Sequence, residues 1–288
     1  MDHNYDTKSL SQFSIGKRIL SILESHIVNR GNIPTKLLDI GCGPGNLTNE
    51  IYNSLNKHNV KITGMDVDQD ALTKAKFKYK NISFIQNDIY HPLKLDEYDY
   101  IFSNEVLHWM PKVPERLLVQ EHILYYFFEQ RVKEEYKNWG LSNYKVSFNN
   151  IYRFLAPGGK AFLQFGLNHQ LFNVYRTINE ILRENFREHC KEIVYPLFYP
   201  ELEEVIEIAE GVGFKVLHAQ LMKEDLVEED AEQIFNFIHG FSSNYLIQQL
   251  GNDQAETFFA NLKKYFHEQD LASIKKDGWY HGFFVLEK

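Results

Sequence analysis

The segment Leu37–Asn46, LLDIGCGPGN, decides the fold. Its apolar run ends at Ile40, three glycines follow at alternate positions, and an amphipathic helical pattern begins at Asn46. Glycine lets the backbone turn sharply and approach a ligand where any Cβ would clash. A helix that starts at such a turn presents its free N–H groups to the ligand. The segment is therefore predicted to be a strand, a ligand-binding loop and a helix.

Short β-branched or aromatic runs alternate with helical patterns along most of the chain. Strands separated by helix-length segments are typical of βαβ units, which build a parallel sheet with helices on its faces. Strands are expected at Lys36–Ile40, Val60–Asp66, Ile82–Gln86, Tyr98–Ser103, Lys160–Phe165, Phe214–Leu221 and Trp279–Leu286. Helices are expected at Ser11–Val28, Asn46–Leu55, Asp70–Lys78, Leu171–Phe186, Leu202–Glu210, Ala231–Leu250 and Gln254–His267.

The composition excludes several classes of protein. Of 288 residues, 31 are Lys or Arg and 39 are Asp or Glu, a net charge of −8 without a basic block, which argues against a nucleic-acid groove. Two cysteines cannot form a disulfide framework or a CxxC zinc pair, so a reducing, cytoplasmic location is expected and no metal site. The chain shows neither a secretory leader pattern nor an apolar run of membrane-spanning length.

Acidic residues stand at the ends of the next two predicted strands. Asp66 ends the second strand in ITGMD, about twenty residues after the glycine loop, where a carboxylate can accept from both ribose hydroxyls. Asp88 follows the third strand in FIQNDIY and can accept a proton of an exocyclic amine, while Ile89 beside it can cover an adenine face. Asp68 is interpreted instead as the cap of the following helix. Three consecutive strand ends thus predict an adenosine-binding site.

Two classes of adenosine cofactor fit these residues. A dinucleotide motif has the spacing GxGxxG or GxGxxA, but Asn46 occupies the last of those positions. A helix N-terminus would nevertheless suit an anionic pyrophosphate.

The combination of LLDI, GxGxG and the two later acids resembles the class I S-adenosylmethionine-dependent methyltransferases. The resemblance implies S-adenosyl-L-methionine as cofactor and S-adenosyl-L-homocysteine as product. It also implies an α/β fold: a Rossmann-like, seven-stranded, mostly parallel sheet with an antiparallel last strand, WYHGFFVLEK, and helical cap insertions. In that family the acid at Asp39 helps to hold the methionine end. The expected cofactor-binding residues are Asp39, Gly41, Cys42, Gly43, Asp66, Val67, Asn87, Asp88, Ile89 and Asn104.

We expect a single domain over residues 1–288. Its cofactor-binding core lies mainly in 30–110 and 155–166. The stretch 111–154 is too long for a single crossover, and 231–276 is a helical pair between two strands. Insertions of this kind most often cover the carboxyl ends of the strands. Cap or substrate segments are expected at approximately 1–20, 111–150, 168–205 and 225–275.

A closer resemblance lies in FSNEVLHW, Phe102–Trp109, followed by LAPGGKAFLQFG. These motifs are similar to those of the trans-aconitate, insect juvenile hormone acid and malonyl-carrier-protein methyltransferases, all of which methylate carboxylates. In the juvenile hormone group a Gln of the N-terminal helix and the Trp of HW hold the substrate carboxylate, and these correspond to Gln12 and Trp109. The resemblance implies methyl-ester formation on a small-molecule or peptidic acid. We expect a monomer or homodimer that binds neither nucleic acid nor a membrane.

The type of acceptor determines which catalytic residues are needed. A carboxylate, with a pKa of about 4, is ionised at pH 7 and needs only neutral donors that orient it, such as the Gln12 amide and the Trp109 indole. A hydroxyl or amine of a small natural product would need a base, for which His108, His169 and His239 are candidates by type. A third hypothesis is a non-catalytic partner protein that binds the cofactor. The expected catalytic residues are Gln12, His108 and Trp109.

Overall fold

The structure is a computed structural model of the chain. It describes residues 10–91, 97–111, 113–114, 117, 130–169, 171–185, 197–224, 230–268 and 278–288. Within several helices some side chains lie outside this description, including that of Gln12.

A seven-stranded sheet forms the centre of the molecule, in the order β3-β2-β1-β4-β5-β7-β6. Strands β1 to β5 pair in parallel, and β7 runs antiparallel between β5 and β6. This confirms the predicted mostly parallel sheet with an antiparallel last strand. The strands are β1 (Thr35–Ile40), β2 (Val60–Asp66), β3 (Ser83–Gln86), β4 (Tyr98–Asn104), β5 (Leu155–Gly166), β6 (Lys215–Glu224) and β7 (Trp279–Glu287).

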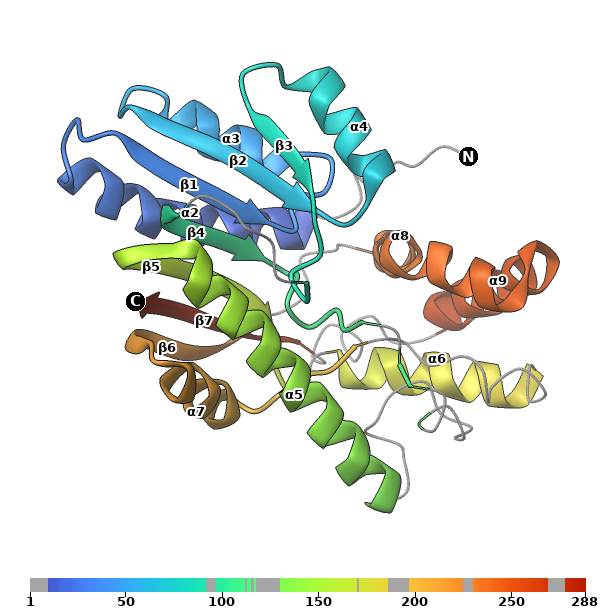
Figure 1. Cartoon of the computed structure of the whole chain (residues 1–288). Helices are drawn as coiled ribbons and strands as arrows, with labels where there is room; N and C mark the ends of the chain where they lie inside the picture. Colours follow the sequence, from blue (N-terminus) through green and yellow to red (C-terminus); the bar gives the residue numbers. More distant parts are fainter. Residues whose placement is uncertain are drawn as a thin grey trace.

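Helices cover both faces of the sheet and one end of it (Figure 1). The apolar stripes of α2, α3 and α4 pack on one face, and those of α5 and α7 form a second core on the other. Helices α6, α8 and α9 lie beyond the carboxyl ends of the parallel strands (Figure 1), the end at which open α/β sheets bind ligands. The helices are α2 (Leu10–Asn29), α3 (Asn46–Leu55), α4 (Gln69–Lys78), α5 (Gln130–Phe154), α6 (Phe172–Asn185), α7 (Leu202–Val212), α8 (Ala231–Leu250) and α9 (Asn252–Glu268).

Helix α5 forms the second part of the long segment that follows Trp109. Tyr144, Phe148 and Ile151 are fully buried and recur at the spacing of one helix face. They belong to the core that also holds α7. The structure therefore assigns the C-terminal half of α5, most of which had been predicted as cap, to the layer that covers the sheet.

Replacing Phe148 by Ala should lower the free energy of unfolding by about 3–5 kcal/mol, because a large buried ring is removed from a packed core. Val146 lies on the same helix but is 42% exposed, so Val146→Ala should change it by less than about 0.5 kcal/mol. Urea denaturation of both variants measures the difference. Equal stabilities would contradict the packing of α5 against the sheet.

Candidate active site

The glycine loop leaves β1 and turns into α3. Its glycines all adopt the left-handed region, with φ of 74° at Gly41, 52° at Gly43 and 82° at Gly45. A Cβ at Gly41 would lie 2.1 Å from a methyl of Val106, so only glycine fits beneath the end of β4. A Cβ at Gly43 would meet no heavy atom of the described chain within 4 Å. Gly41 thus serves packing, whereas Gly43 leaves room for a ligand to approach the backbone closely.

Asp66 ties this loop to the end of β2. Its Oδ2 accepts a hydrogen bond from the Gly43 N–H at 2.7 Å, and its Oδ1 accepts one from the Asp68 N–H at 2.9 Å. Burial raises the pKa of Asp66, while these two hydrogen bonds act to lower it. A carboxylate has about four lone-pair sites, so both oxygens retain acceptor capacity for ribose hydroxyls. Its role as the ribose acceptor stays a prediction, and the structure adds a role in holding the loop.

Asp39 lies beneath the loop and is 3% exposed. Thr48, in the first turn of α3, donates its hydroxyl to the Asp39 carboxylate at 2.6 Å. Burial, opposed by the Thr48 hydrogen bond, raises the pKa of Asp39 to about 7. The neighbouring Cys42 is buried as well, and burial raises the pKa of its thiol, so a reactive thiolate is disfavoured.

Asp88 follows β3 and is half-buried. Its Oδ1 accepts a hydrogen bond from the Tyr90 N–H at 2.9 Å, and its Oδ2 lies 3.3 Å from Nδ1 of the exposed His91. The carboxylate is therefore held in place by its own turn. Its expected contact with the adenine amine stays a prediction.

The remaining predicted cofactor residues flank these acids. Val67, directly after β2, leaves 58% of its surface exposed, whereas Ile89 is 7% exposed and packs in the core. Asn87 is buried, and its backbone N–H donates to the Asp66 carbonyl at 3.0 Å. Of the two aliphatic side chains, Val67 is therefore the one that offers exposed surface beside the strand ends, whereas Ile89 was expected to do so. Asp68 caps α4 by accepting from the N–H groups of Asp70 and Ala71, which confirms its interpretation as a cap.

Helix α2 passes close to the end of β4. A Cβ at Gly16 would lie 2.6 Å from Leu47 and 3.2 Å from the Asn104 amide nitrogen. This close contact brings α2 against both the helix after the glycine loop and the last residue of β4. Gln12 precedes Gly16 by one helical turn, which places its backbone near this junction.

His108 and Trp109 follow β4. His108 is 4% exposed, and its Nδ1 accepts a hydrogen bond from the Gly166 N–H at 3.0 Å. Burial lowers the pKa of His108 to about 3, so the ring is neutral and carries its proton on Nε2. Trp109 is half-buried, forms a backbone bridge with Leu197, and its ring centroid lies 6.0 Å from that of His108.

Glu105 is a residue of this region that the sequence analysis did not assign. It is 8% exposed and accepts a hydrogen bond from the Gln164 side chain at 2.6 Å. The sequence could have identified Glu105 as a buried acid, because it directly follows the strand Tyr98–Asn104 and precedes the apolar pair Val106 and Leu107.

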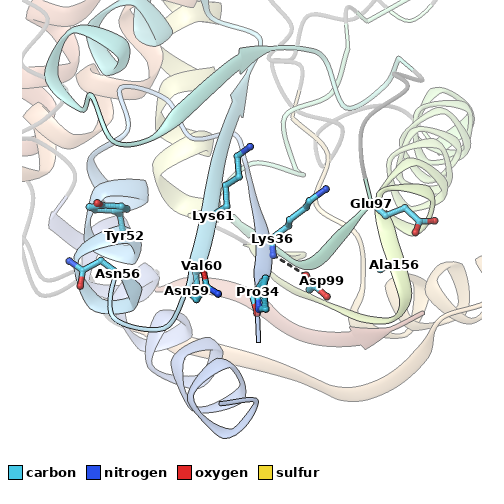
Figure 2. Close-up of a pocket in the computed structure, with 11 residues that line it drawn as sticks. Pro34, Lys36, Tyr52, Asn56, Asn59, Val60, Lys61, Glu97, Asp99 and Ala156 are labelled. Carbon is cyan, nitrogen blue, oxygen red and sulfur yellow. Dashed lines mark hydrogen bonds between the residues drawn. The ribbon is translucent and has the colours of Figure 1, made fainter. Parts of the chain in front are cut away.

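The candidate site is distinct from two hollows of the described structure. A hollow of about 750 Å³ opens at the amino ends of the strands, between Lys36, Lys61 and Glu97 (Figure 2), opposite the glycine loop. A second, of about 420 Å³, lies between α2 and the strands β6 and β7. Within the described residues no three His, Cys, Asp or Glu side chains are grouped as metal ligands. None of the helices described is both long and apolar enough to cross a membrane.

A Rossmann-like sheet with a glycine loop and two acids at adjacent strand ends defines a protein that binds an adenosine-containing cofactor. Comparison of the sequence with known families identifies the class more closely, because the family described as "Methyltransferase domain" matches residues 34–199. The chain therefore belongs to this methyltransferase family, and S-adenosylmethionine is its cofactor. The open space at Gly43 and the acceptors of Asp66 fit that cofactor.

Curated relatives carry related names. A malonyl-[acyl-carrier protein] O-methyltransferase of Ilyobacter polytropus is 28% identical over 88% of this chain and 80% of its own length. The juvenile hormone acid O-methyltransferase of Bombyx mori is 24% identical over 72% of this chain and 67% of its own. A trans-aconitate 2-methyltransferase of Rhodopseudomonas palustris is 34% identical, but over only 27% of this chain and 30% of its own.

Solved structures share the fold. A loganic acid methyltransferase with SAH matches with a TM-score of 0.79 at 12% identity, over 100% of this chain and 97% of its own. Coclaurine N-methyltransferase bound to N-methylheliamine and SAH matches with a TM-score of 0.52 at 14% identity, over 93% and 72%. The fold thus occurs with different acceptors, and the acceptor has to be inferred from the site.

Asp66→Ala should weaken the binding of S-adenosylhomocysteine by about 1–3 kcal/mol, because it removes the predicted ribose acceptor and releases the Gly43 N–H. The matched control is Asp68→Ala, which removes the cap of α4 and should cost about 1 kcal/mol of stability while leaving that affinity unchanged. Isothermal calorimetry and thermal unfolding measure the two effects. Unchanged affinity in Asp66→Ala would remove this carboxylate from the cofactor site.

Proposed function

We propose that this methyltransferase acts on a carboxylate of a small-molecule or peptidic acid and forms a methyl ester. The observation that carries the proposal lies just after β4, where His108 and Trp109 stand four and five residues beyond Asn104 and offer neutral N–H donors. The names of the malonyl-carrier-protein, trans-aconitate and juvenile hormone acid relatives support it.

The cofactor, when bound, supplies a methyl group that is already activated by the positive charge on its sulfur. Asp66 would hold the ribose, Asp88 the adenine amine, and the loop through Gly43 the adjoining part of the cofactor. The task of the protein is then to align the acceptor and to exclude water. Alignment of two reacting groups alone can contribute roughly 7–11 kcal/mol to catalysis.

A carboxylate acceptor suits the state of His108. An acid with a pKa of about 4 is ionised at pH 7, and no proton has to be removed. The Nδ1 lone pair of His108 is used by the Gly166 N–H, and Nε2 carries the proton, so this ring has no nitrogen left to act as a base. It can serve as a donor. A hydroxyl or amine acceptor would therefore need a base other than His108.

Neutral donors are also matched to the chemistry of a carboxylate. A strong charged partner would hold the acceptor but reduce its nucleophilicity, because the same lone pairs attack the methyl group. The Trp109 indole and the Gln12 amide are donors without a charge. We infer that they fix one carboxylate oxygen while leaving the reactive oxygen free.

An acid panel tests the proposal. The protein is incubated with a labelled methyl donor and trans-aconitate, terpenoid acids, a malonyl thioester or peptides with free carboxyl termini, and products are treated with mild alkali. Esters release labelled methanol, whereas ethers and methylamines do not. Alkali-stable products would support the hydroxyl or amine alternative, and cofactor binding without turnover of any substrate class would support a non-catalytic partner protein.

Trp109→Phe should lower kcat/KM for the acid by about 10- to 100-fold, the effect of losing one hydrogen bond to a charged group. The dissociation constant of S-adenosylhomocysteine should stay unchanged. Trp139→Phe is the matched control, since that ring packs on Tyr136 in α5 with centroids 4.9 Å apart. If Trp109→Phe retained full turnover, the indole would not be an acceptor donor.

A further inference from the structure

We propose that Glu105, which is buried between Gln164 and His108 without an ion-pair partner among the described Lys and Arg residues, is a specificity-determining residue of the acceptor end of the site and controls the entry of anionic acceptors. This inference rests on the proposed function. It concerns a residue that stands in the chain between Asn104, an expected cofactor residue, and His108 and Trp109, the expected acceptor donors. Four observations on its position, contacts and surroundings lead to it.

The first observation is the position of Glu105. It follows Asn104 of β4, which lies against α2 at Gly16, and it precedes Val106, whose methyls lie against Gly41. His108 comes three residues later. Glu105 is thus fixed where β4, the glycine loop and α2 meet.

The second observation is its backbone conformation. Glu105 has φ of 57°, in the left-handed region that few residues other than glycine adopt. Such a conformation persists only when the surrounding structure imposes it, and it is frequent at functional sites. Here the Glu105 N–H donates to the Gln164 carbonyl at 2.8 Å, which extends the pairing of β4 with β5 by one residue.

The third observation is the packing of the side chain, of which 5% is exposed. The Gln164 amide donates to Glu105 Oε1 at 2.6 Å. Gln164 is itself fully buried, and its own Oε1 has no hydrogen-bond partner within the described structure. The other carboxyl oxygen, Glu105 Oε2, lies 4.0 Å from His108 Nε2, beyond hydrogen-bond distance.

The fourth observation concerns charge. No Lys or Arg of the described residues forms an ion pair with Glu105, and its closest ionisable neighbour, His108, is neutral because Nδ1 accepts from Gly166. Glu105 is also near enough to Tyr175 to interact with it electrostatically. The Tyr175 hydroxyl shares a hydrogen bond of 3.0 Å with that of Tyr199, and neither phenol supplies a positive charge. An isolated buried carboxylate without a cation is strongly disfavoured.

Burial therefore raises the pKa of Glu105 to about 8, and the Gln164 hydrogen bond opposes this only in part. At pH 7 the group is a neutral acid. As the pH rises through about 8, it becomes a carboxylate beside the site at which an anionic acceptor must bind. Like charges in a buried site repel each other, so binding of the acceptor should be lost.

Glu105→Gln tests the proposal, because the amide has nearly the same shape and cannot ionise. With the panel acid of highest turnover, wild-type kcat/KM should fall tenfold per pH unit above pH 8, since this parameter reports the ionisations of the free enzyme. The variant should keep a flat profile from pH 7 to pH 9.5, whatever its kcat/KM at pH 7. KM for the cofactor should be the same in both.

The matched control is Glu97→Gln, an exposed glutamate at the opposite end of the sheet, which should keep the wild-type loss at alkaline pH. If Glu105→Gln does not fold, the wild-type protein alone gives the answer. Binding of the panel acid should weaken above pH 8, whereas binding of its uncharged primary amide should not.

The two proposals fail in different ways. Superimposable pH profiles of wild type and Glu105→Gln, with methyl ester formed by both, would overturn the role of Glu105. Equal pH dependence for the acid and its amide would overturn it too. If neither protein formed alkali-labile product from any acid at any pH, the proposed function itself would be wrong.

Discussion

The carboxylate of Asp66 connects the parts of the site on which the others depend. It accepts the N–H groups of Gly43 and Asp68, so the glycine loop after β1 and the turn after β2 are held by one side chain. Without this link the Gly43 N–H would need another partner, and an unpaired backbone N–H in a part-buried turn is costly. The same carboxylate is the expected ribose acceptor, so loop geometry and cofactor recognition are coupled in one residue.

The fold could be predicted almost completely because its signals are local. Inner strands such as β2 are short runs rich in buried residues, and β2 was predicted with the boundaries Val60–Asp66 that the structure has. The two acids at the strand ends could be predicted for the same reason, since the carboxyl ends of neighbouring parallel strands share one edge. Helix α5 was not predicted as a helix, although its buried face runs from Tyr136 through Tyr144 and Phe148 to Ile151.

The contacts that set the protonation states could not be predicted from the sequence. The partner of His108 is the backbone of Gly166, 58 positions away, and that of the Glu105 side chain is Gln164, 59 positions away. Both pairs arise from the register of β4 against β5, which no single segment encodes. Thr48 is only nine residues from Asp39, but the sequence analysis interpreted Asp39 as a cofactor-binding residue and did not predict its hydrogen bond with Thr48.

These contacts give the two sides of the site different electrostatic characters. On the side of β1 and β2, the charge of Asp66 helps to disfavour ionisation of Asp39, and a cation placed beside them would favour the ionised form. On the side of β4 and β5, Glu105 and His108 are buried without a counter-ion and are neutral at pH 7. An acidic side suits a positively charged methyl donor, and a neutral side with N–H donors suits an anionic acceptor. Burial, more than the number of charged residues, therefore determines which part of the site favours a cation and which favours an anion.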